Sequence, residues 1–232
     1  MSPMRSCLII PRAHVAETMF TFGAGALIFD FADSEGIKRH ASLIRRARET
    51  LCPSRLLARL PRLDDPAFDL ALETLRGAAP DGVVLQAAEG AETVQQLGSR
   101  LAVFEAEADV ADGAIRIVAE LSTPAGLLSC AALARASPRL HALLFGRAAL
   151  ASALGTEENS APVETARALL ALAAAAAGAL ALDAPCRDPG KLKEECVAAR
   201  RDGFLGKCAV SPKDIGVIES VFSADKSPHS PR

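Results

Sequence analysis

The sequence carries little net charge and has no basic stripe. Its 232 residues include 26 Lys and Arg against 28 Asp and Glu, which gives a formal net charge of -2. Proteins that bind nucleic acid cluster Lys and Arg on one face or along one helix. The balanced and scattered charge therefore argues against nucleic acid as a partner.

Cysteine and histidine are few and irregularly spaced. The six cysteines stand at positions 7, 52, 130, 186, 196 and 208, without a CxxC pair. Without an export signal, we expect them to be reduced thiols that fill small spaces in the core. The four histidines, at positions 14, 40, 141 and 229, share no metal-ligand spacing, so a histidine metal site is not expected.

Long hydrophobic runs are also missing. The first apolar run covers only Cys7 to Ile10 before Pro11 and Arg12, which is too short for the core of a signal peptide. Residues 168–182 are wholly apolar, but they are fewer than the roughly 18 to 20 residues of a membrane span, and alanine dominates them. We expect a buried helix that runs into a strand, no membrane partner, and a cytoplasmic protein.

What the sequence does have is a regular alternation of strand-like and helix-like segments. Half of the residues are apolar, enough for a sizeable core in one barrel or in two smaller domains. The expected strands are residues 6–10, 26–30, 55–59, 83–85, 115–121, 141–145, 180–183 and 207–210. The expected helices are residues 14–22, 34–50, 65–76, 91–105, 126–135, 163–178, 190–202 and 213–222.

This alternation predicts an α/β fold with short connections. Eight strands, each followed by a helix, are typical of a parallel (β/α)8 TIM barrel, although the pattern alone also fits a doubly wound open sheet. No composition change marks an internal boundary. We therefore expect a single domain over residues 1–222, followed by a disordered tail at 223–232.

Two strand-to-helix joints stand out. The segments RIVAELSTPAG at 116–126 and LHALLFGRAAL at 140–150 are apolar runs that end abruptly at small or turn-forming residues before an alanine- and leucine-rich helical pattern. In α/β proteins such joints lie at the carboxyl ends of parallel strands, where barrels and open sheets carry their chemistry. The candidate site is expected at these joints.

The same segments carry a family resemblance. In chain order the motifs are IIPR at 9–12, GAGALIFDFADS at 23–34, ARL at 58–60, DGVVLQAAEGAETV at 81–94, AELSTPAG at 119–126, LLFGRAAL at 143–150 and DGFLGKCAVSPKDI at 202–215. Together they resemble the citrate lyase beta subunit family, that is, HpcH/HpaI aldolase/citrate lyase. The resemblance covers nearly the whole chain and implies a barrel rather than an open sheet.

The resemblance also implies a chemistry. Members of the family hold Mg²⁺ with a glutamate that closes the fifth strand, in a motif like ALIET-x-x-G, and an aspartate after the sixth, in FG-x-x-D-L. The ion polarises the keto oxygen of a 2-oxo acid or its enolate. The implied activity is the cleavage or condensation of a carbon–carbon bond in citryl- or malyl-type CoA thioesters and 2-oxo acids.

This chain departs from the family pattern at both metal positions. Aligned on Gly126, the glutamate position is Ser122, and aligned on Phe145 and Gly146, the aspartate position is Ala149. A hydroxyl and a methyl group replace two carboxylates, so the sequence predicts no metal ligands at these positions. Further family positions differ at Gln86 with Ala87, at Ala32 and at Ser211.

Several candidate site residues remain. The resemblance assigns Arg59 to the arginine that grips the carboxylate of the oxo acid, a task that suits its planar fork of donors. Asp33, with Asp30, keeps the acidic end of the second strand, Glu89 lies in the fourth loop and Lys207 starts the eighth strand. Each also has a structural interpretation: a barrel-mouth ion pair for Arg59, a helix N-terminal charge for Asp33, and solvated loop residues for Glu89 and Lys207.

Glu120 is the third candidate catalytic residue, with Arg59 and Asp33. It lies two positions before Ser122, so in a strand both side chains point to the same face, with Glu120 one layer deeper. Its carboxylate either reaches a displaced cation, and so compensates for the lost glutamate, or is buried against an arginine such as Arg59 or Arg116.

Arg12, Gly146 and Arg147 complete the candidate substrate-binding set, which also holds Arg59, Glu89 and Lys207. Arg12 and Arg147 stand at predicted strand ends where the family has less basic residues. If both face the barrel mouth, the metal-centred site has become an arginine-rich one suited to phosphate or carboxylate. If not, they are surface charges.

Two functions remain open. One is a lyase or aldolase-like enzyme with an altered or metal-free site, acting on a 2-oxo acid or an acyl-CoA. The other is a non-catalytic barrel that binds a carboxylate, phosphate or CoA-type ligand, or a partner subunit. The fold alone does not decide between these two functions. The resemblance further implies a homo-oligomer, a trimer or larger.

Overall fold

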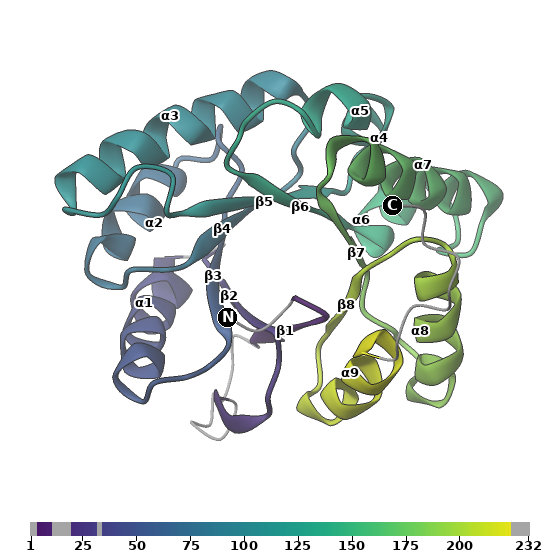
Figure 1. Ribbon diagram of the computed structural model, residues 1–232. Coiled ribbons are helices and arrows are strands. Elements are labelled where there is room, and N and C mark those ends of the chain that lie inside the picture. The colour runs from purple at the N-terminus through teal and green to yellow at the C-terminus, as the bar shows by residue number, and fades with distance from the viewer. Residues whose placement is uncertain (1–3, 11–19, 32–33, 224–232) are drawn as a thin grey trace.

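The computed structural model describes residues 4–10, 20–31 and 34–223, and its strands form a closed parallel barrel in the order β1 to β8. Figure 1 shows the strands around a central axis with the helices outside them. The strands are β1 (Ser6–Ile10), β2 (Ala26–Asp30), β3 (Arg55–Leu60), β4 (Gly82–Leu85), β5 (Arg116–Leu121), β6 (Leu140–Phe145), β7 (Leu180–Asp183) and β8 (Gly206–Ala209). The predicted eight-stranded barrel is confirmed.

Helices follow the strands and cover their outer faces. They are α1 (Ser34–Glu49), α2 (Phe68–Thr74), α3 (Ala91–Glu107), α4 (Pro124–Leu128), α5 (Cys130–Leu133), α6 (Arg147–Leu154), α7 (Ala161–Ala177), α8 (Leu192–Arg201) and α9 (Ile215–Ser223). Short 3-10 turns precede α8 and α9 and follow α2. The expected helix at 126–135 is two short helices, and most of the expected helix at 14–22, like the tail at 224–232, lies outside the described residues.

Local sequence explains where the helices beside the barrel mouth start and stop. Thr123 caps α4, because its hydroxyl accepts a hydrogen bond from the backbone N–H of Gly126, at 3.1 Å, and Pro124 occupies the first turn. Helices α6 and α7 end at Gly155 and Gly178, with φ of 65° and 69°. This left-handed conformation costs glycine little, so both helices stop at defined residues.

Two apolar layers hold the barrel together. The larger layer lies between the strands and the helices, and includes the fully buried Phe29, Phe31 and Phe68. The smaller one fills the barrel interior, and includes Ile28, Leu57 and Val118. Because strand side chains alternate, the residues two positions before or after an interior residue also point inward.

No helix in the described ranges has both the length and the apolar character needed to cross a membrane. The apolar stretch at 168–182 divides between the end of α7 and β7, as expected from the sequence. Leu170 and Ala174 of this stretch are buried against the barrel, and Leu182 lies in its interior.

Candidate functional site

A cavity of about 670 Å³ opens at the carboxyl ends of the strands, where the sequence predicts the site. Residues of β1, β2, β3, β5, β6 and β8 form its inner wall. The start of α6 and the loops after α6 and β7 form its outer wall. Of the predicted site residues, four line this cavity: Arg59, Glu120, Gly146 and Arg147. Ala149 lines it too, at one of the two positions that the resemblance assigns to the metal.

Arg59 and Glu120 form the central polar contact of the cavity. Arg59 Nε donates to Glu120 Oε2 at 2.7 Å and Arg59 Nη2 donates to Oε1 at 3.0 Å, so the two planar groups meet at two points. Arg59 Nη1 also lies 3.4 Å from Asp30 Oδ2. Of the two arrangements expected for Glu120, the structure has the one in which it is buried against Arg59.

This pairing changes the electrostatics of the arginine. Burial by itself would lower the pKa of the Arg59 guanidinium, but the hydrogen bond and charge of Glu120, together with the charge of Asp30, outweigh burial and raise that pKa. Arg59 is therefore a permanent cation whose fork of donors is already occupied by a carboxylate of the same chain.

Arg147, the first residue of α6, is held less tightly. Its Nη2 lies 3.6 Å from Asp183 Oδ1 and its Nη1 lies 3.7 Å from Glu195 Oε2, which are ion-pair distances rather than hydrogen bonds. Its Nε is buried and has no hydrogen-bond partner among the described residues. Gly146, which caps α6, supplies no side-chain acceptor, so the first N–H groups of the helix also lack an internal partner.

Gly146 is required where β6 meets α6. A Cβ on this residue would overlap with the Cβ of Ser122 and come within 3.2 Å of the Leu121 carbonyl oxygen. Ser122 is buried against this backbone at the end of β5. The ends of β5 and β6 are therefore packed backbone to backbone at the two joints that the sequence singles out.

The rim of the cavity carries a further ion pair that the sequence does not predict. Arg187, in the loop after β7, places Nη2 2.7 Å from Glu158 Oε1, in the loop between α6 and α7. Neither loop carries a sequence motif, so the sequence does not predict that the two residues meet. Closure of the barrel brings them together.

Lys207 does not line this cavity. Its neighbours Gly206 and Cys208 face the barrel interior, so Lys207 points outward and is buried between β8 and α8. Its ammonium group donates to Asp183 Oδ2 at 2.9 Å and to Glu195 Oε2 at 3.0 Å. Arg167 of α7 donates to Asp183 as well, at 3.1 Å. The structure therefore places Lys207 in a buried ionic network rather than at the mouth.

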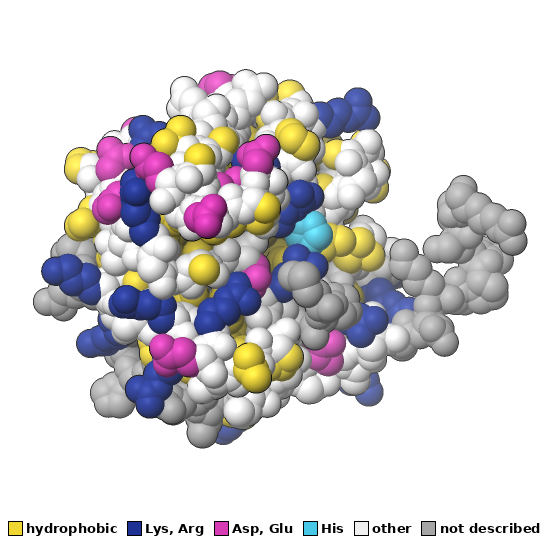
Figure 2. Space-filling view, turned by 60° about the vertical axis from the view of Figure 1, so that its left-hand side comes forward, with side chains coloured by type: hydrophobic (Ala, Val, Ile, Leu, Met, Phe, Trp, Pro, Cys, Tyr) yellow, Lys and Arg dark blue, Asp and Glu magenta, His cyan; other side chains and the backbone are white. Residues whose placement is uncertain are grey.

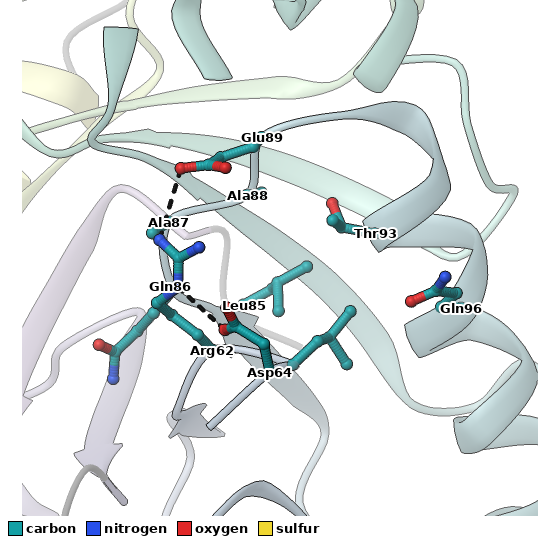
Figure 3. A pocket seen from close by; sticks show the side chains of 10 residues that line it. Arg62, Asp64, Leu85, Gln86, Ala87, Ala88, Glu89, Thr93 and Gln96 are labelled. Carbon is teal, nitrogen blue, oxygen red and sulfur yellow. Dashed lines mark hydrogen bonds and ion pairs between the residues drawn. The ribbon is translucent and has the colours of Figure 1, made fainter. Parts of the chain in front are cut away.

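Glu89 lines a second, smaller pocket of about 310 Å³ between the loops after β3 and β4 and the start of α3. Figure 3 shows Arg62 between Asp64 and Glu89, with Thr93 and Gln96 on the other side of the pocket. Arg62 Nε lies 3.1 Å from Asp64, and Arg62 Nη1 lies 3.4 Å from Glu89. Glu89 is thus apart from Arg59 and Glu120. The remaining predicted residues, Arg12 and Asp33, lie outside the described residues.

The carboxylates at the mouth are already paired with arginines. In the ranges that the structure describes, no three His, Cys, Asp or Glu side chains are grouped to hold a metal. The carboxylates nearest the cavity, Asp30, Glu120 and Glu158, each have an arginine partner. A cation there would have to displace an arginine from its carboxylate.

Comparison with known proteins gives the site a family context. The family model for HpcH/HpaI aldolase/citrate lyase matches residues 8–212. The chain is 25% identical to the citrate lyase subunit beta of Escherichia coli (strain K12) over 231 residues, which covers 94% of this chain and 76% of that protein.

Two solved structures resemble the barrel over nearly its whole length. RipC from Yersinia pestis is 30% identical, with a TM-score of 0.75 over 97% of this chain and 96% of that one. A citrate lyase beta subunit from Mycobacterium tuberculosis, complexed with oxaloacetate and magnesium, is 27% identical, with a TM-score of 0.72 over 94% of this chain and 96% of that one. On the family match and the closed barrel, the chain belongs to the HpcH/HpaI aldolase/citrate lyase family.

Proposed function

We propose that this barrel binds a carboxylate-bearing ligand of the 2-oxo acid or acyl-CoA type at its mouth without magnesium, and that the metal-dependent lyase activity of the family is lost. The two-point pair between Arg59 and Glu120 carries this proposal. By family resemblance, Arg59 would grip the carboxylate of an oxo acid. Here the N–H donors of Arg59 that such a ligand needs are already bonded to Glu120.

The metal positions support the same conclusion. The motif resemblance assigns Ser122 and Ala149 to positions where the family has carboxylates, and Mg²⁺ selects carboxylate and water oxygens. Without the ion, a developing enolate would have no Lewis acid to stabilise it. Carbon–carbon cleavage by the family route therefore loses its main source of stabilisation.

Arg147 is the group that we assign to ligand binding. It lines the cavity, its Nε has no hydrogen-bond partner among the described residues, and it opens α6, whose N-terminus favours an anion. A guanidinium suits a carboxylate or phosphate because it donates two parallel hydrogen bonds. The ligand's anionic group would lie against Arg147 while its remainder occupies the cavity.

Isothermal titration with oxaloacetate and with acetyl-CoA, each with and without Mg²⁺, tests this proposal. We expect wild-type binding to be unchanged by Mg²⁺ and to weaken about tenfold in Arg147→Gln, the loss of one charge-assisted contact. Arg62→Gln, in the smaller pocket, is the matched control. Tighter binding with Mg²⁺ in the wild type, or equal binding by Arg147→Gln, would contradict the proposal.

A carbon–carbon lyase with an altered site is the second candidate, favoured by the family and by the position of Glu120 in the cavity. In that case Glu120 leaves Arg59 to hold a cation or a proton. Incubation with citryl-CoA or malyl-CoA and detection of the oxo acid product separates the two candidates. Product formation that Glu120→Gln abolishes would favour the lyase.

A further inference from the structure

The opposite end of the barrel holds a group of basic side chains that the mouth does not use. Arg55 begins β3, Arg116 begins β5 and His141 is the second residue of β6, so all three lie at the amino ends of their strands. Leu57 and Val118, two positions further along β3 and β5, belong to the barrel interior. By alternation, Arg55 and Arg116 face the interior as well.

No side chain separates the two arginines on the strand between them. In the sheet register Gly82 of β4 is the partner of both Leu57 and Arg116. A Cβ on Gly82 would come within 2.7 Å of the Arg116 carbonyl oxygen and 3.1 Å of Leu57 Cδ2, so the position has to be glycine. His141 is skipped by the sheet register, which pairs Ile117 with Leu140 and Val118 with Ala142, and the charges of Arg55 and Arg116 act on its ring. We call these three side chains the basal cluster.

The basal cluster has no counter-charge among the residues that the structure describes. In the described part of the chain neither Arg55 nor Arg116 is within ion-pair distance of a carboxylate, and the Nε of Arg55 is buried without a hydrogen-bond partner. The neighbouring Asp81 is engaged elsewhere: it lies 2.6 Å from Arg48 and accepts a hydrogen bond from the Leu56 backbone at 2.7 Å. Figure 2 shows one histidine side chain on the face it draws, with Lys or Arg side chains beside it.

The lowered pKa of His141 agrees with this excess of positive charge. Burial lowers the pKa of its imidazole, and the charges of Arg55 and Arg116 lower that pKa further. Arg55 and Arg116 are the charged groups that face it, while Leu180 on the adjacent β7 is apolar. Half-buried cations without partners are unfavourable, and an anion that bridges them removes the penalty.

We propose that the basal cluster is a binding site for a phosphate-type dianion, separate from the mouth of the barrel. Two guanidinium groups offer planar forks that match phosphate oxygens, and the imidazole adds a third donor when it is protonated. The interior layer that includes Leu57, Val84 and Val118 lies between this site and the Arg59–Glu120 pair. The site is therefore independent of any ligand at the mouth.

Binding at this site is linked to protonation. Because His141 is neutral around pH 7 in the free protein, a bound dianion raises its pKa and the complex takes up a proton. Affinity for the dianion therefore increases as the pH falls from 8 to 6, by an amount set by the shift in the pKa of His141.

The proposal is tested by titrating the full chain with inorganic phosphate at constant ionic strength. NMR of the His141 ring and calorimetry measure the binding. We expect the His141 resonances to shift, with at least threefold tighter binding at pH 6 than at pH 8 when the affinity is calculated for the dianion, because the dianion's share of inorganic phosphate falls over the same range. Arg55→Gln and Arg116→Gln should each weaken binding about tenfold, a contact of ~1.4 kcal/mol. Arg187→Gln, at the mouth, should leave it unchanged.

Thermal unfolding of the same variants separates binding from folding. Replacing one cation should not destabilise the unliganded chain, because it removes repulsion, and it should reduce the rise in Tm that phosphate causes in the wild type. A His141 resonance that does not respond to phosphate overturns the proposal. So does equal binding by all variants, or binding that only Arg187→Gln weakens.

Discussion

Arg59 on β3 and Glu120 on β5 meet at two points, 2.7 and 3.0 Å, across the intervening strand β4. Their strands are not neighbours, so the contact exists only because the sheet closes and turns both side chains toward the axis. The pair ties the ends of β3 and β5 together at the barrel mouth. It also decides which charge a ligand meets there.

The first prediction concerns the energy of this pair. Glu120→Gln leaves Arg59 partly buried with one weaker acceptor, and should lower the free energy of unfolding by about 2 to 3 kcal/mol, as measured in urea. Glu73→Gln, which removes the partner of Arg76 on an exposed helix surface, is the control and should cost less than about 1 kcal/mol. Equal costs for the two variants would mean that the pair contributes little.

A second substitution of Glu120 should change ligand binding. Glu120→Leu frees the fork of Arg59 for a carboxylate, so oxaloacetate should bind about tenfold more tightly than to the wild type, by calorimetry. The matched control is Glu158→Leu, which frees Arg187 at the rim. Unchanged affinity in Glu120→Leu would show that Arg59 does not reach the ligand.

Acid should weaken the buried network around Asp183. Burial alone would raise the pKa of Asp183, but Lys207 and Arg167 outweigh it and hold that pKa below its usual value. A carboxyl with a lowered pKa stabilises the fold above its unfolded pKa of about 3.9, and this contribution is lost as the pH falls through the folded value. Asp183→Asn should therefore flatten the loss of stability below about pH 4. Asp69→Asn, at an exposed position, should keep the wild-type slope.

The joint between β6 and α6 should tolerate no side chain at its glycine. Gly146→Ala forces a Cβ against Ser122 and the Leu121 carbonyl, and should destabilise the protein by about 2 kcal/mol in thermal or urea unfolding. Gly216→Ala, inside α9 with open space around it, should be neutral or stabilising by up to about 1 kcal/mol. A tolerated Gly146→Ala would mean that the end of β5 can move.

Thiol reactivity should follow burial. A hydrogen bond to Cys7 and burial raise the pKa of Cys208, and burial raises the pKa of Cys196 to about 11. Cys52 is less buried than the other cysteines, so a thiol reagent at pH 7.5 should label it first in the native protein. Mass spectrometry of native and urea-unfolded samples checks this, with Cys52→Ser as the control. Early labelling of Cys208 would contradict it.

Much of the fold follows from sequence pattern. The apolar runs predict β1, β2 and β7 with the bounds that the structure has, because Pro, Gly and Asp residues delimit them. The family resemblance chooses the barrel over the open sheet. The site is less predictable: the strand ends place Arg59, Glu120 and Arg147 at the mouth, but not the partner that each one takes.

Lys207 shows why. All four residues of β8 are buried, so no alternation of polar and apolar residues tells which side chains face the axis. Arg55, Arg116 and His141 are missed for a different reason. They stand at strand starts, far from any motif, and only closure of the barrel brings them together.

The Arg59–Glu120 pair also links the stability of the barrel to what its mouth can bind. A ligand that takes the donors of Arg59 has to replace a two-point contact between β3 and β5. Its binding energy is then reduced by the cost of breaking that contact. Affinity at the mouth and stability of the empty barrel should therefore change in opposite directions when this contact is altered.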